Sequence, residues 1–454
     1  MEPGRPPEKK PIGASTPALV PLAVGGHYLP AMKIIFFPLS ASGHINPTLP
    51  IARELVSRGA QVVYFATREY EKAVRHTGAD FRELADSYRV ADPSTLPFSH
   101  TGDLVRFERQ LAPVLMGFMA RGMSGVPELL ERVRAEKADC MVYDHACNWA
   151  RVLIKPLGLR AVAFFSSYAL SPSSPLAREL RKAMGGVPPP GMLLPLLRLM
   201  WTGQKLRWRH GIPPLSLTDA LNVREEVNIV PLPRGFQPDG HTFDERFHFV
   251  GPSVTSRVET ADFDLGLLER NPTLFISLGT MLNRRLDFYA ACFEAFANTH
   301  WQVVLSSGSA DLSSLGKPPP NFIVRARVPQ LEVLARSRLF LTHGGMNSTM
   351  EGLWYGVPMV VFPQMIEQAA TAARVEELGF GRFLRAGSPS ARELREAVEA
   401  VDGNPSHRER LREFQPQVRE AGGHVRAADA IERFLRREAR SAASDTGLSA
   451  HAAR

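Results

Sequence analysis

Residues 342–352, THGGMNSTMEG, form a segment of this 454-residue chain that is well equipped for chemistry. The apolar run RLFLT predicts a buried strand that ends just before His343, Gly344 and Gly345, and a helix is expected to begin near Met346. Glycine lets the backbone approach a ligand closely, and a helix N-terminus offers free N–H groups and partial positive charge to an anion. The segment therefore predicts a site for a diphosphate.

Three polar side chains follow on the same predicted helix. Asn347 and Ser348 place donors in its first turn, and Glu351 stands three residues after Ser348. Three residues advance a helix by about 4.5 Å and return to nearly the same face, so the Glu351 carboxylate could accept both hydroxyls of a ribose beside the diphosphate. The plain alternative is a strand-to-helix turn that binds nothing, with Glu351 in solvent.

A second candidate site lies near the start of the chain. KIIFFPL at 33–39 predicts a buried parallel strand, and the turn SASGH brings His44 to the carboxyl edge of that sheet, where ligands of α/β proteins gather. Imidazole suits a base at neutral pH, and such a base needs a partner that holds its tautomer. Asp144, at the end of the predicted strand DCMVYD, is the candidate partner. From the residues alone, His44 could also be incidental, and Asp144 could cap the helix after Ala146.

The order of the motifs resembles a known family. VPQ at 328–330, THGGMNSTMEG, GVP at 356–358 and PQ followed by Glu367-Gln368 succeed one another, and the opening PLSASGHINPTLPIARELVSRG and SLGT at 277–280 are of the same kind. In these motifs the chain is similar to the nucleotide-sugar-dependent glycosyltransferases of the GT-B architecture. More closely, it resembles the bacterial macrolide and natural-product branch of the UDP-glycosyltransferase family. The N-terminal tail and residues 171–215 fall outside the resemblance.

The resemblance implies a role for each residue that matches a family motif. His44 would be the catalytic base with Asp144 as its partner, and Glu351 would bind the ribose. Glu367 and Gln368 would read the hydroxyls of the transferred sugar, as an acid and an amide can. The other implied donor contacts are backbone contacts of Val328 and Gln330 to the base, and contacts of Thr280, His343, Gly345, Asn347 and Ser348 to the diphosphate.

Two positions depart from the family's pattern. Arg327 stands where family members carry an aromatic residue that stacks on the base. A guanidinium can also stack on a nucleobase, but it leaves the choice between uridine and thymidine open. Glu367 replaces the usual aspartate and is one methylene longer, which keeps the acceptor and blurs which sugar is read.

We expect no metal ion and no cofactor, because the sugar nucleotide is a co-substrate. Asp262-Phe263-Asp264 has the D-x-D spacing with which glycosyltransferases of another fold hold a divalent cation, but it ends no hydrophobic strand and is better explained as a helix N-cap. His241 and His248 have no third ligand nearby, so zinc is not predicted. A nicotinamide cofactor would want G-x-G-x-x-G after the first strand, and SASGHI lacks it.

The acceptor pocket is expected in two apolar, loop-rich stretches, 88–125 and 171–210. Methionine and phenylalanine adapt to varied hydrophobic surfaces, which favours a broad, apolar acceptor range. The side chains that we expect to line the pocket are Phe98, Phe107, Met116, Phe118, Met123, Met192, Met200 and Trp201. Each of them could equally belong to a helix core.

The elements that must position these residues alternate between strand and helix. Apolar strand patterns recur at 33–39, 61–67, 139–144, 160–165, 273–279, 301–306, 321–324, 338–342 and 358–363. This alternation predicts an α/β fold of two Rossmann-like, doubly wound parallel-sheet domains facing a cleft. We expect a disordered tail at 1–31, an acceptor domain at 32–230, a linker at 231–252, a nucleotide-sugar domain at 253–439 and a frayed tail at 440–454. The resemblance implies that the terminal helix, 424–437, crosses back over the cleft.

Composition excludes several other classes of protein. The chain is 44% hydrophobic and 22% charged, and no apolar run reaches the roughly 18 residues of a membrane span. We therefore expect no stable membrane insertion. The chain's three cysteines lack paired spacing, which favours a reducing compartment, so we expect a cytoplasmic enzyme. The net charge of +8 comes from arginines interleaved with glutamates, which indicates a solvated surface and no nucleic-acid partner. The chain could be a monomer or a homodimer.

These features predict an inverting glycosyltransferase that moves a hexose to a hydroxyl of a hydrophobic macrolide, polyketide or flavonoid-like acceptor. UDP-glucose is the first choice of donor, and a dTDP-sugar is the other. Two alternatives stay open: a nucleotide-sugar epimerase or hydrolase of the same fold, and a non-catalytic nucleotide-sugar-binding partner protein. A non-catalytic protein would be expected to have lost the pair His44 and Asp144.

Overall fold

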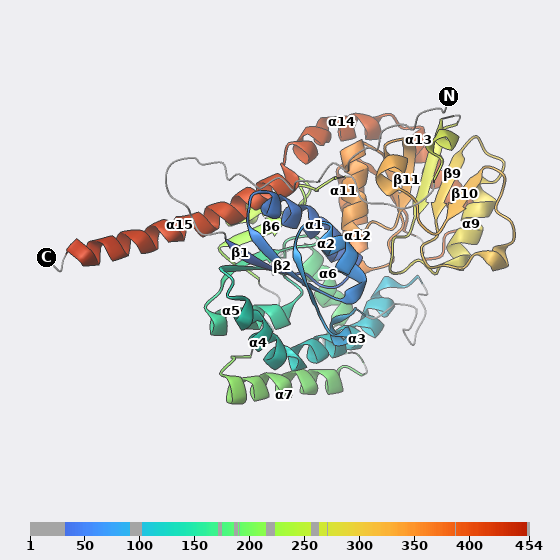
Figure 1. Ribbon diagram of the computed structural model, residues 1–454. Coiled ribbons are helices and arrows are strands. Elements are labelled where there is room, and N and C mark those ends of the chain that lie inside the picture. The colour runs from blue at the N-terminus through green and yellow to red at the C-terminus, as the bar shows by residue number, and fades with distance from the viewer. Residues whose placement is uncertain are drawn as a thin grey trace, which may run out of the picture. The chain divides into compact units, whose positions relative to one another are not determined.

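Two parallel β-sheets with helices between their strands carry the chain from Met32 onward (Figure 1). The computed structural model describes residues 32–90, 102–170, 175–185, 189, 191–214, 223–255, 263–269, 271–385 and 387–451. Among these residues every pair of neighbouring strands is parallel. The fold class is therefore the predicted one, two α/β domains with doubly wound parallel sheets.

The first sheet has seven described strands in the order β3-β2-β1-β4-β5-β6-β7. They are β1 (Lys33–Phe37), β2 (Gln61–Ala66), β3 (Asp80–Glu83), β4 (Cys140–Asp144), β5 (Arg160–Phe164), β6 (Val227–Val230) and β7 (Phe247–Phe249). Its helices are α1 (Ser42–Ser57), α2 (Glu71–Arg75), α3 (Leu104–Ser124), α4 (Val126–Glu136), α5 (Asn148–Leu157), α6 (Pro175–Met184) and α7 (Leu193–His210). One-turn 3-10 helices occur at Arg68–Tyr70, Asp86–Tyr88 and Gly240–Thr242.

The second sheet has six described strands in the order β10-β9-β8-β11-β12-β13. They are β8 (Thr273–Ser277), β9 (Gln302–Ser306), β10 (Phe322–Arg325), β11 (Ser337–Thr342), β12 (Met359–Val361) and β13 (Gly381–Phe383). Its helices are α9 (Leu286–Phe296), α10 (Gln330–Leu334), α11 (Met346–Tyr355), α12 (Ile366–Glu377), α13 (Ala391–Asp402) and α14 (Ser406–Arg419), with 3-10 turns η5 (Leu265–Leu268) and Ser313–Leu315. The chain then forms α15 (Gly423–His451).

Strand β1 is apolar throughout because helices cover both of its faces. Ile34 and Phe36 pack in one hydrophobic cluster with side chains of α1 and α15. Ile35 and Phe37 point the other way, into a second cluster that includes side chains of α3, α4 and α5. Successive residues of a strand face opposite sides, so a strand buried on both faces has no polar alternation. The short run KIIFF could therefore be recognised as a buried strand from its sequence.

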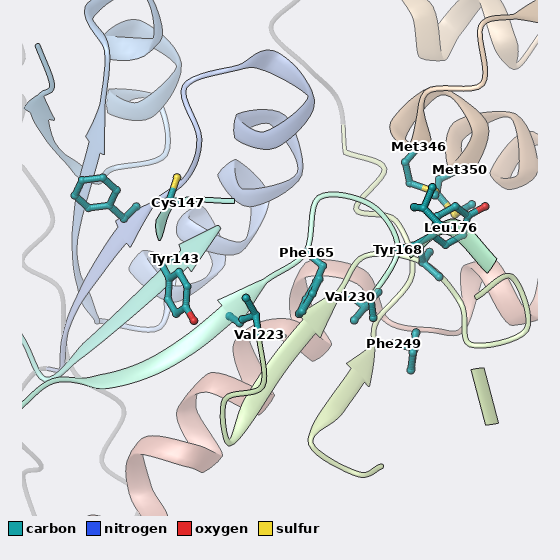
Figure 2. Packing of buried hydrophobic residues seen from close by; sticks show 14 of the residues in the cluster. Tyr143, Cys147, Phe165, Tyr168, Leu176, Val223, Val230, Phe249, Met346 and Met350 are labelled. Atoms are coloured by element: carbon teal, nitrogen blue, oxygen red, sulfur yellow. The ribbon is translucent and has the colours of Figure 1, made fainter. Parts of the chain in front are cut away.

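The second cluster continues from the first sheet to the helices of the second sheet. Figure 2 labels Phe165 and Val230 beside strands of the first sheet, and Met346 and Met350 on α11; all four belong to this cluster. A further cluster covers the opposite face of the second sheet with side chains of α9 and α13. Apolar packing thus fixes the helix that follows β11 relative to the first sheet.

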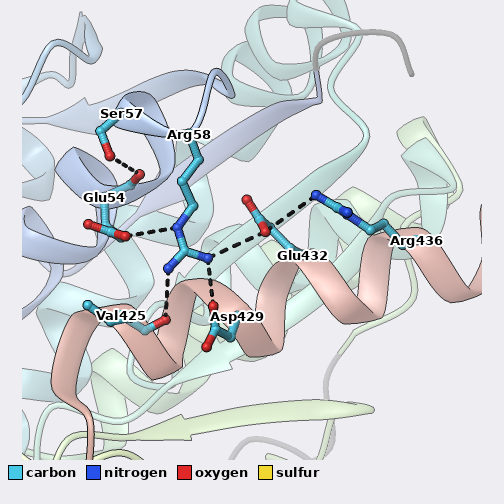
Figure 3. A network of polar contacts seen from close by, with 7 residues as sticks. All are labelled: Glu54, Ser57, Arg58, Val425, Asp429, Glu432 and Arg436. Carbon is cyan, nitrogen blue, oxygen red and sulfur yellow. Dashed lines mark hydrogen bonds and ion pairs between the residues drawn. The ribbon is translucent and has the colours of Figure 1, made fainter. Parts of the chain in front are cut away.

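Helix α15 returns from the second sheet to pack on α1 (Figures 1 and 3). Arg58, which follows α1, lies 2.7 Å from the Asp429 carboxylate and also donates to Glu54 and to the carbonyl of Val425. Arg160 of β5 donates to the last carbonyls of the buried part of α15, at Phe434 and Leu435. These contacts attach the C-terminal helix to the first domain.

Several predicted boundaries look different in the structure. The segment 231–252, expected as a linker, contains β7, which pairs with β6 in the first sheet. In the irregular stretch 171–215 the described residues form α6 and α7. The expected tail at 1–31 lies outside the described residues, and of the expected tail at 440–454 the structure describes a helical backbone to His451.

Candidate active site

His44 and Asp144 meet at the carboxyl edge of the first sheet. Asp144 is the last residue of β4, and His44 lies in the first turn of α1, which follows the neighbouring strand β1. The helix begins at Ser42, so His44 is on the helix and not on the preceding turn as expected. Its Nδ1 lies 2.7 Å from Asp144 Oδ2, with 24% of the histidine side chain and none of the aspartate side chain exposed. Nδ1 is engaged, which leaves Nε2 as the ring nitrogen that a ligand could reach.

The two groups shift each other's protonation. Burial disfavours the imidazolium of His44, but the charge of Asp144 and its hydrogen bond outweigh burial and raise the pKa of His44 above its ordinary value. Burial likewise opposes ionisation of Asp144, yet His44 and the N–H of Ala146 hold the pKa of Asp144 below its ordinary value. Asp144 thus pairs with His44 and accepts the N–H of Ala146, but it does not cap the next helix, because α5 begins only at Asn148 and has no side-chain cap.

A second histidine, which the sequence did not indicate as a site residue, lies beside the same carboxylate. His145 Nδ1 lies 3.4 Å from Asp144 Oδ1, and its ring stacks on Phe165 with centroids 4.9 Å apart. Burial lowers the pKa of His145, which keeps this imidazole neutral at pH 7. Its position directly after Asp144 in the sequence was the available signal. Asp144 therefore has two imidazoles beside its carboxylate, and only that of His44 is hydrogen-bonded to it.

The glycines after β11 lead into a helix start without a capping side chain. Gly344 has φ of +81°, a conformation that favours glycine, and Gly345 immediately precedes α11 and offers no side-chain cap. The first intrahelical bond runs from the N–H of Thr349 to Gly345, so the N–H groups before it have no partner within the helix. This is the geometry that the sequence predicted for an anion site.

His343 is held between two glycines. A Cβ atom on Gly345 would overlap the His343 ring, and one on Gly279 would come within 2.6 Å of that ring. Gly279 belongs to the SLGT loop after β8, so the side chain joins the ends of two neighbouring strands. Burial lowers the pKa of His343 to about 4. The ring is neutral at pH 7 and can offer one N–H donor to a ligand.

Gln330, Ser348 and Glu351 form a polar cluster between α10 and α11. Gln330 Nε2 lies 2.5 Å from Glu351 Oε2 and 3.3 Å from Ser348 Oγ. Glu351 is 3% exposed. Glu351 is therefore not a solvated helix residue, and the side chain of Gln330 helps to position it, a contact that the sequence did not indicate.

Side chains of the second domain reach the surroundings of His44. Asn347 Nδ2 donates to the carbonyl of Gly43 over 3.0 Å. The charge of Glu367, in the first turn of α12, contributes to raising the pKa of His44. Glu108 of α3 accepts the N–H of Ile366 over 3.0 Å, at the start of the same helix. Glu367, which is expected to bind the donor sugar, thus lies close enough to the proposed base to act on its charge.

Of the other donor residues predicted from the sequence, Gln368 is on α12, and Thr280, Arg327 and Val328 follow strands of the second sheet. Gln368 Oε1 accepts the N–H of Gln364, which fixes the side chain and leaves its NH2 group for a ligand. Val328 is buried, whereas Thr280 and Arg327 are exposed. Thr280 follows β8, and Arg327 follows β10.

The expected acceptor residues do not share one environment. Phe107, Phe118 and Met123 of α3 are buried in the core, and Met116 and Met192 are half-buried. Met200 and Trp201 of α7 are largely exposed. Phe98 lies outside the described residues. The structure thus buries three of the expected residues of α3, whereas Met200 and Trp201 of α7 lie on an outer surface.

The D-x-D motif is partly described. The Asp264 carboxylate accepts the N–H of Gly266 and caps η5, while Asp262 lies outside the described residues. Within the described ranges no three His, Cys, Asp or Glu side chains are grouped as metal ligands would be. In the same ranges no helix combines the length and apolarity needed to cross a membrane.

Comparisons with known proteins give a consistent assignment. Residues 291–420 match the family model of the erythromycin biosynthesis protein CIII-like C-terminal domain. The chain is 37% identical over 407 residues to the NDP-glycosyltransferase YjiC of Bacillus licheniformis, covering 88% of this chain and 97% of that protein. It is 31% identical to the demethyllactenocin mycarosyltransferase of Streptomyces fradiae, covering 88% and 86%. The crystal structure of the calicheamicin glycosyltransferase CalG4 superposes with a TM-score of 0.72 at 30% identity, covering 90% and 100%.

The two parallel-sheet domains and these similarities define a glycosyltransferase of the GT-B architecture. The chain belongs to the UDP-glycosyltransferase family, in its branch of macrolide and natural-product glycosyltransferases. The resemblance in its motifs is thereby confirmed.

Proposed function

We propose that this glycosyltransferase moves a hexose from a nucleoside-diphosphate sugar, UDP-glucose as first choice, to a hydroxyl of a hydrophobic natural product with inversion. The observation that carries the proposal is the contact of 2.7 Å between His44 Nδ1 and the buried Asp144 carboxylate. A buried carboxylate on Nδ1 fixes the tautomer that has its lone pair on Nε2. His44 can then act as a base toward a hydroxyl.

The proposed reaction is one displacement. Nε2 of His44 removes the proton of the acceptor hydroxyl while its oxygen attacks the anomeric carbon of the sugar. The bond from this carbon to the diphosphate oxygen breaks on the opposite face, and the nucleoside diphosphate leaves with the electron pair. An α-linked donor therefore gives a β-glycoside. Asp144 stabilises the imidazolium, which afterwards releases its proton to solvent.

The leaving group would be stabilised by neutral donors of the second domain. The N–H groups at the start of α11 and the hydroxyl of Ser348 can receive the charge that develops on the diphosphate, together with a neutral His343. Glu351 would accept the ribose hydroxyls, and Glu367 and Gln368 the sugar hydroxyls. Because these donors suffice for the charge, we propose that no metal ion takes part, and activity should persist with excess chelator.

The names of two relatives support a hydrophobic acceptor. One is a demethyllactenocin mycarosyltransferase, and another, 29% identical, is the oleandomycin glycosyltransferase of Streptomyces antibioticus. Both names refer to macrolide products. We therefore propose macrolides, polyketides or phenolic aglycones as acceptors of this chain.

A grid of donors and acceptors tests the proposal. UDP-glucose and dTDP-glucose would each be incubated with several macrolides and phenols, with products read by mass and the anomeric configuration by NMR. We expect β-glycosides of apolar acceptors, and a His44→Ala variant that still binds donor in calorimetry without forming product. Full activity of His44→Ala would remove the base assignment. Conversion of the donor alone, without acceptor, would favour an epimerase or hydrolase.

A further inference from the structure

Helix α7 presents large apolar side chains to solvent. Trp208 is 79% exposed, Leu193 68%, Trp201 66% and Met200 61%. Leu194 and Leu197 are also more than half exposed. Scattered exposed leucines are ordinary on a protein surface, but six large apolar residues on one helix are not.

These six residues form one stripe. Neighbouring residues of an α-helix are about 100° apart, which places all six within an arc of about 120°. The opposite side of the helix contains the buried Gly203 and Leu206 and packs along α3. Figure 1 shows α7 as the outermost helix on this side of the first sheet. The stripe thus belongs to a helix that is fixed to the body of the protein by its other face.

Basic residues border the stripe on both sides. By the same helical spacing, Arg198, Lys205 and Arg209 lie beyond one edge of the arc and Arg207 beyond the other. All four are exposed, and α7 contains no acidic residue. Lys205 Nζ lies 5.6 Å from the centre of the Trp201 ring, so the cationic rim and the apolar stripe adjoin. An apolar face with a cationic border complements a surface that has a layer of anionic groups over an apolar interior.

We propose that α7 docks this protein on the surface of a bilayer that contains anionic phospholipid. The leucines and tryptophans would enter the boundary between headgroups and acyl chains, and the arginines and Lys205 would contact lipid phosphates. The helix would lie in the plane of the surface, without spanning the bilayer. A second copy of the chain fits less well, because pairing two α7 helices would bring the cationic rims together. The inference does not depend on the proposed transferase reaction.

Vesicle binding tests the proposal on the full chain. Flotation with vesicles of phosphatidylglycerol and phosphatidylcholine should carry the protein upward, vesicles of phosphatidylcholine alone should carry much less, and added salt should weaken binding. Tryptophan emission should shift to shorter wavelength on binding. Leu197→Ser/Trp208→Ser should lower the partition coefficient on the order of tenfold. Lys205→Gln/Arg209→Gln should lower it on the order of thirtyfold on the mixed vesicles only.

Matched variants elsewhere provide the controls. Leu267→Ser removes another exposed leucine, and Arg392→Gln removes another exposed arginine; both should bind vesicles as the parent does. Unchanged unfolding curves would show that the α7 variants are folded. Equal binding by parent and α7 variants would overturn the proposal, as would equal binding to both vesicle types. Self-association lost in Leu197→Ser/Trp208→Ser, without vesicle binding by the parent, would assign the stripe to a second copy instead.

Discussion

The side chain of Asn347 replaces a hydrogen bond that helix α1 cannot make for itself. An α-helix satisfies the carbonyl of residue 43 with the N–H of residue 47, but this residue is Pro47, which has no N–H. Asn347 Nδ2 donates to the Gly43 oxygen over 3.0 Å. The turn that carries His44 is thereby tied to the start of α11, where the diphosphate is proposed to bind.

Asn347→Ala should lower kcat because the Gly43 carbonyl loses its donor and His44 loses a fixed position. We expect a decrease on the order of tenfold, from the loss of one hydrogen bond. Pro47→Ala supplies a helical donor to the same carbonyl. In a Pro47→Ala background, Asn347→Ala should therefore cost less, which steady-state kinetics of the four proteins would measure as a coupling energy.

Asn404→Ala is the control for this cycle, since Asn404 caps α14 far along the chain and should affect stability without affecting kcat. Equal losses for Asn347→Ala in both backgrounds would show that the contact with Gly43 is not what matters. The loss would then be explained by a direct contact between Asn347 and the sugar nucleotide.

Asp144→Asn should move the pH dependence of activity. A base must be neutral to act, so the acid limb of kcat/KM follows the pKa of His44 in the free enzyme. Burial lowers this pKa and Asp144 raises it above its ordinary value. Removing the charge of Asp144 leaves only Glu367 to oppose the effect of burial on the pKa of His44, so the acid limb should shift to lower pH. The rate should also fall on the order of a hundredfold or more, because the tautomer is no longer held.

Rate profiles of the parent and of Asp144→Asn over the same buffers would measure both effects. Asp264→Asn is the matched control, because Asp264 caps only η5. An acid limb that stays in place in Asp144→Asn would mean that another group titrates, with His145 on the same carboxylate as the first candidate.

Strand ends and spacing made the main pair of the site predictable. His44 follows β1 and Asp144 ends β4, and neighbouring parallel strands bring their carboxyl ends to one edge. Glu351 was predictable as a site residue from its helical spacing, whereas its contact with Gln330 was not, because that contact depends on how α10 packs against α11. Pro47 shows that the carbonyl of Gly43 lacks its helical hydrogen bond, but nothing in the sequence shows that Asn347 donates to this carbonyl instead.

Contacts between segments that are distant in the sequence could not be predicted. Glu108 stands in an ordinary amphipathic stretch, and nothing in its neighbours indicates that it caps α12 more than 250 residues later. The exposure of Trp201 was likewise hidden, because an apolar residue on an amphipathic helix has the same spacing whether its stripe faces a core or solvent. Both the contact of Glu108 and the exposure of Trp201 depend on how helices pack against one another, and local sequence patterns do not determine this packing.

Gly345→Ala should displace His343. The added Cβ would overlap the His343 ring, which is half-buried and bounded on its other side by Gly279. Since Gly345 has φ of −61°, the backbone tolerates alanine and the effect is steric. We expect donor KM to rise by about tenfold or more if the neutral ring contacts the diphosphate, with stability lowered by about 1–3 kcal/mol from overpacking.

Donor calorimetry and urea unfolding would separate these two effects. Gly117→Ala in α3 is the control, because its Cβ would meet only the side chain of Arg121 at 3.7 Å. Donor binding as tight in Gly345→Ala as in the parent would contradict a diphosphate contact for His343.

Glu108 should position the sugar-reading end of α12 as a hydrogen-bond acceptor and not as a charge. Its carboxylate accepts the N–H of Ile366 over 3.0 Å, and burial together with the nearby charge of Glu367 raises the pKa of Glu108. A raised carboxyl pKa means that this group stabilises the fold most below its unfolded pKa and loses that contribution as pH rises through the folded value. Glu108→Gln keeps an acceptor and removes the charge, so its stability should equal or exceed that of the parent at pH 7.

Glu108→Ala, by contrast, leaves the N–H of Ile366 without its acceptor. We expect a loss of about 1–2 kcal/mol in the free energy of unfolding and a raised KM for the sugar nucleotide, because Glu367 and Gln368 follow directly on α12. Urea unfolding at several pH values and donor kinetics would measure both. If Glu108→Gln and Glu108→Ala raised the donor KM equally, the negative charge of Glu108 would be the active feature, and the role assigned to its hydrogen bond would be wrong.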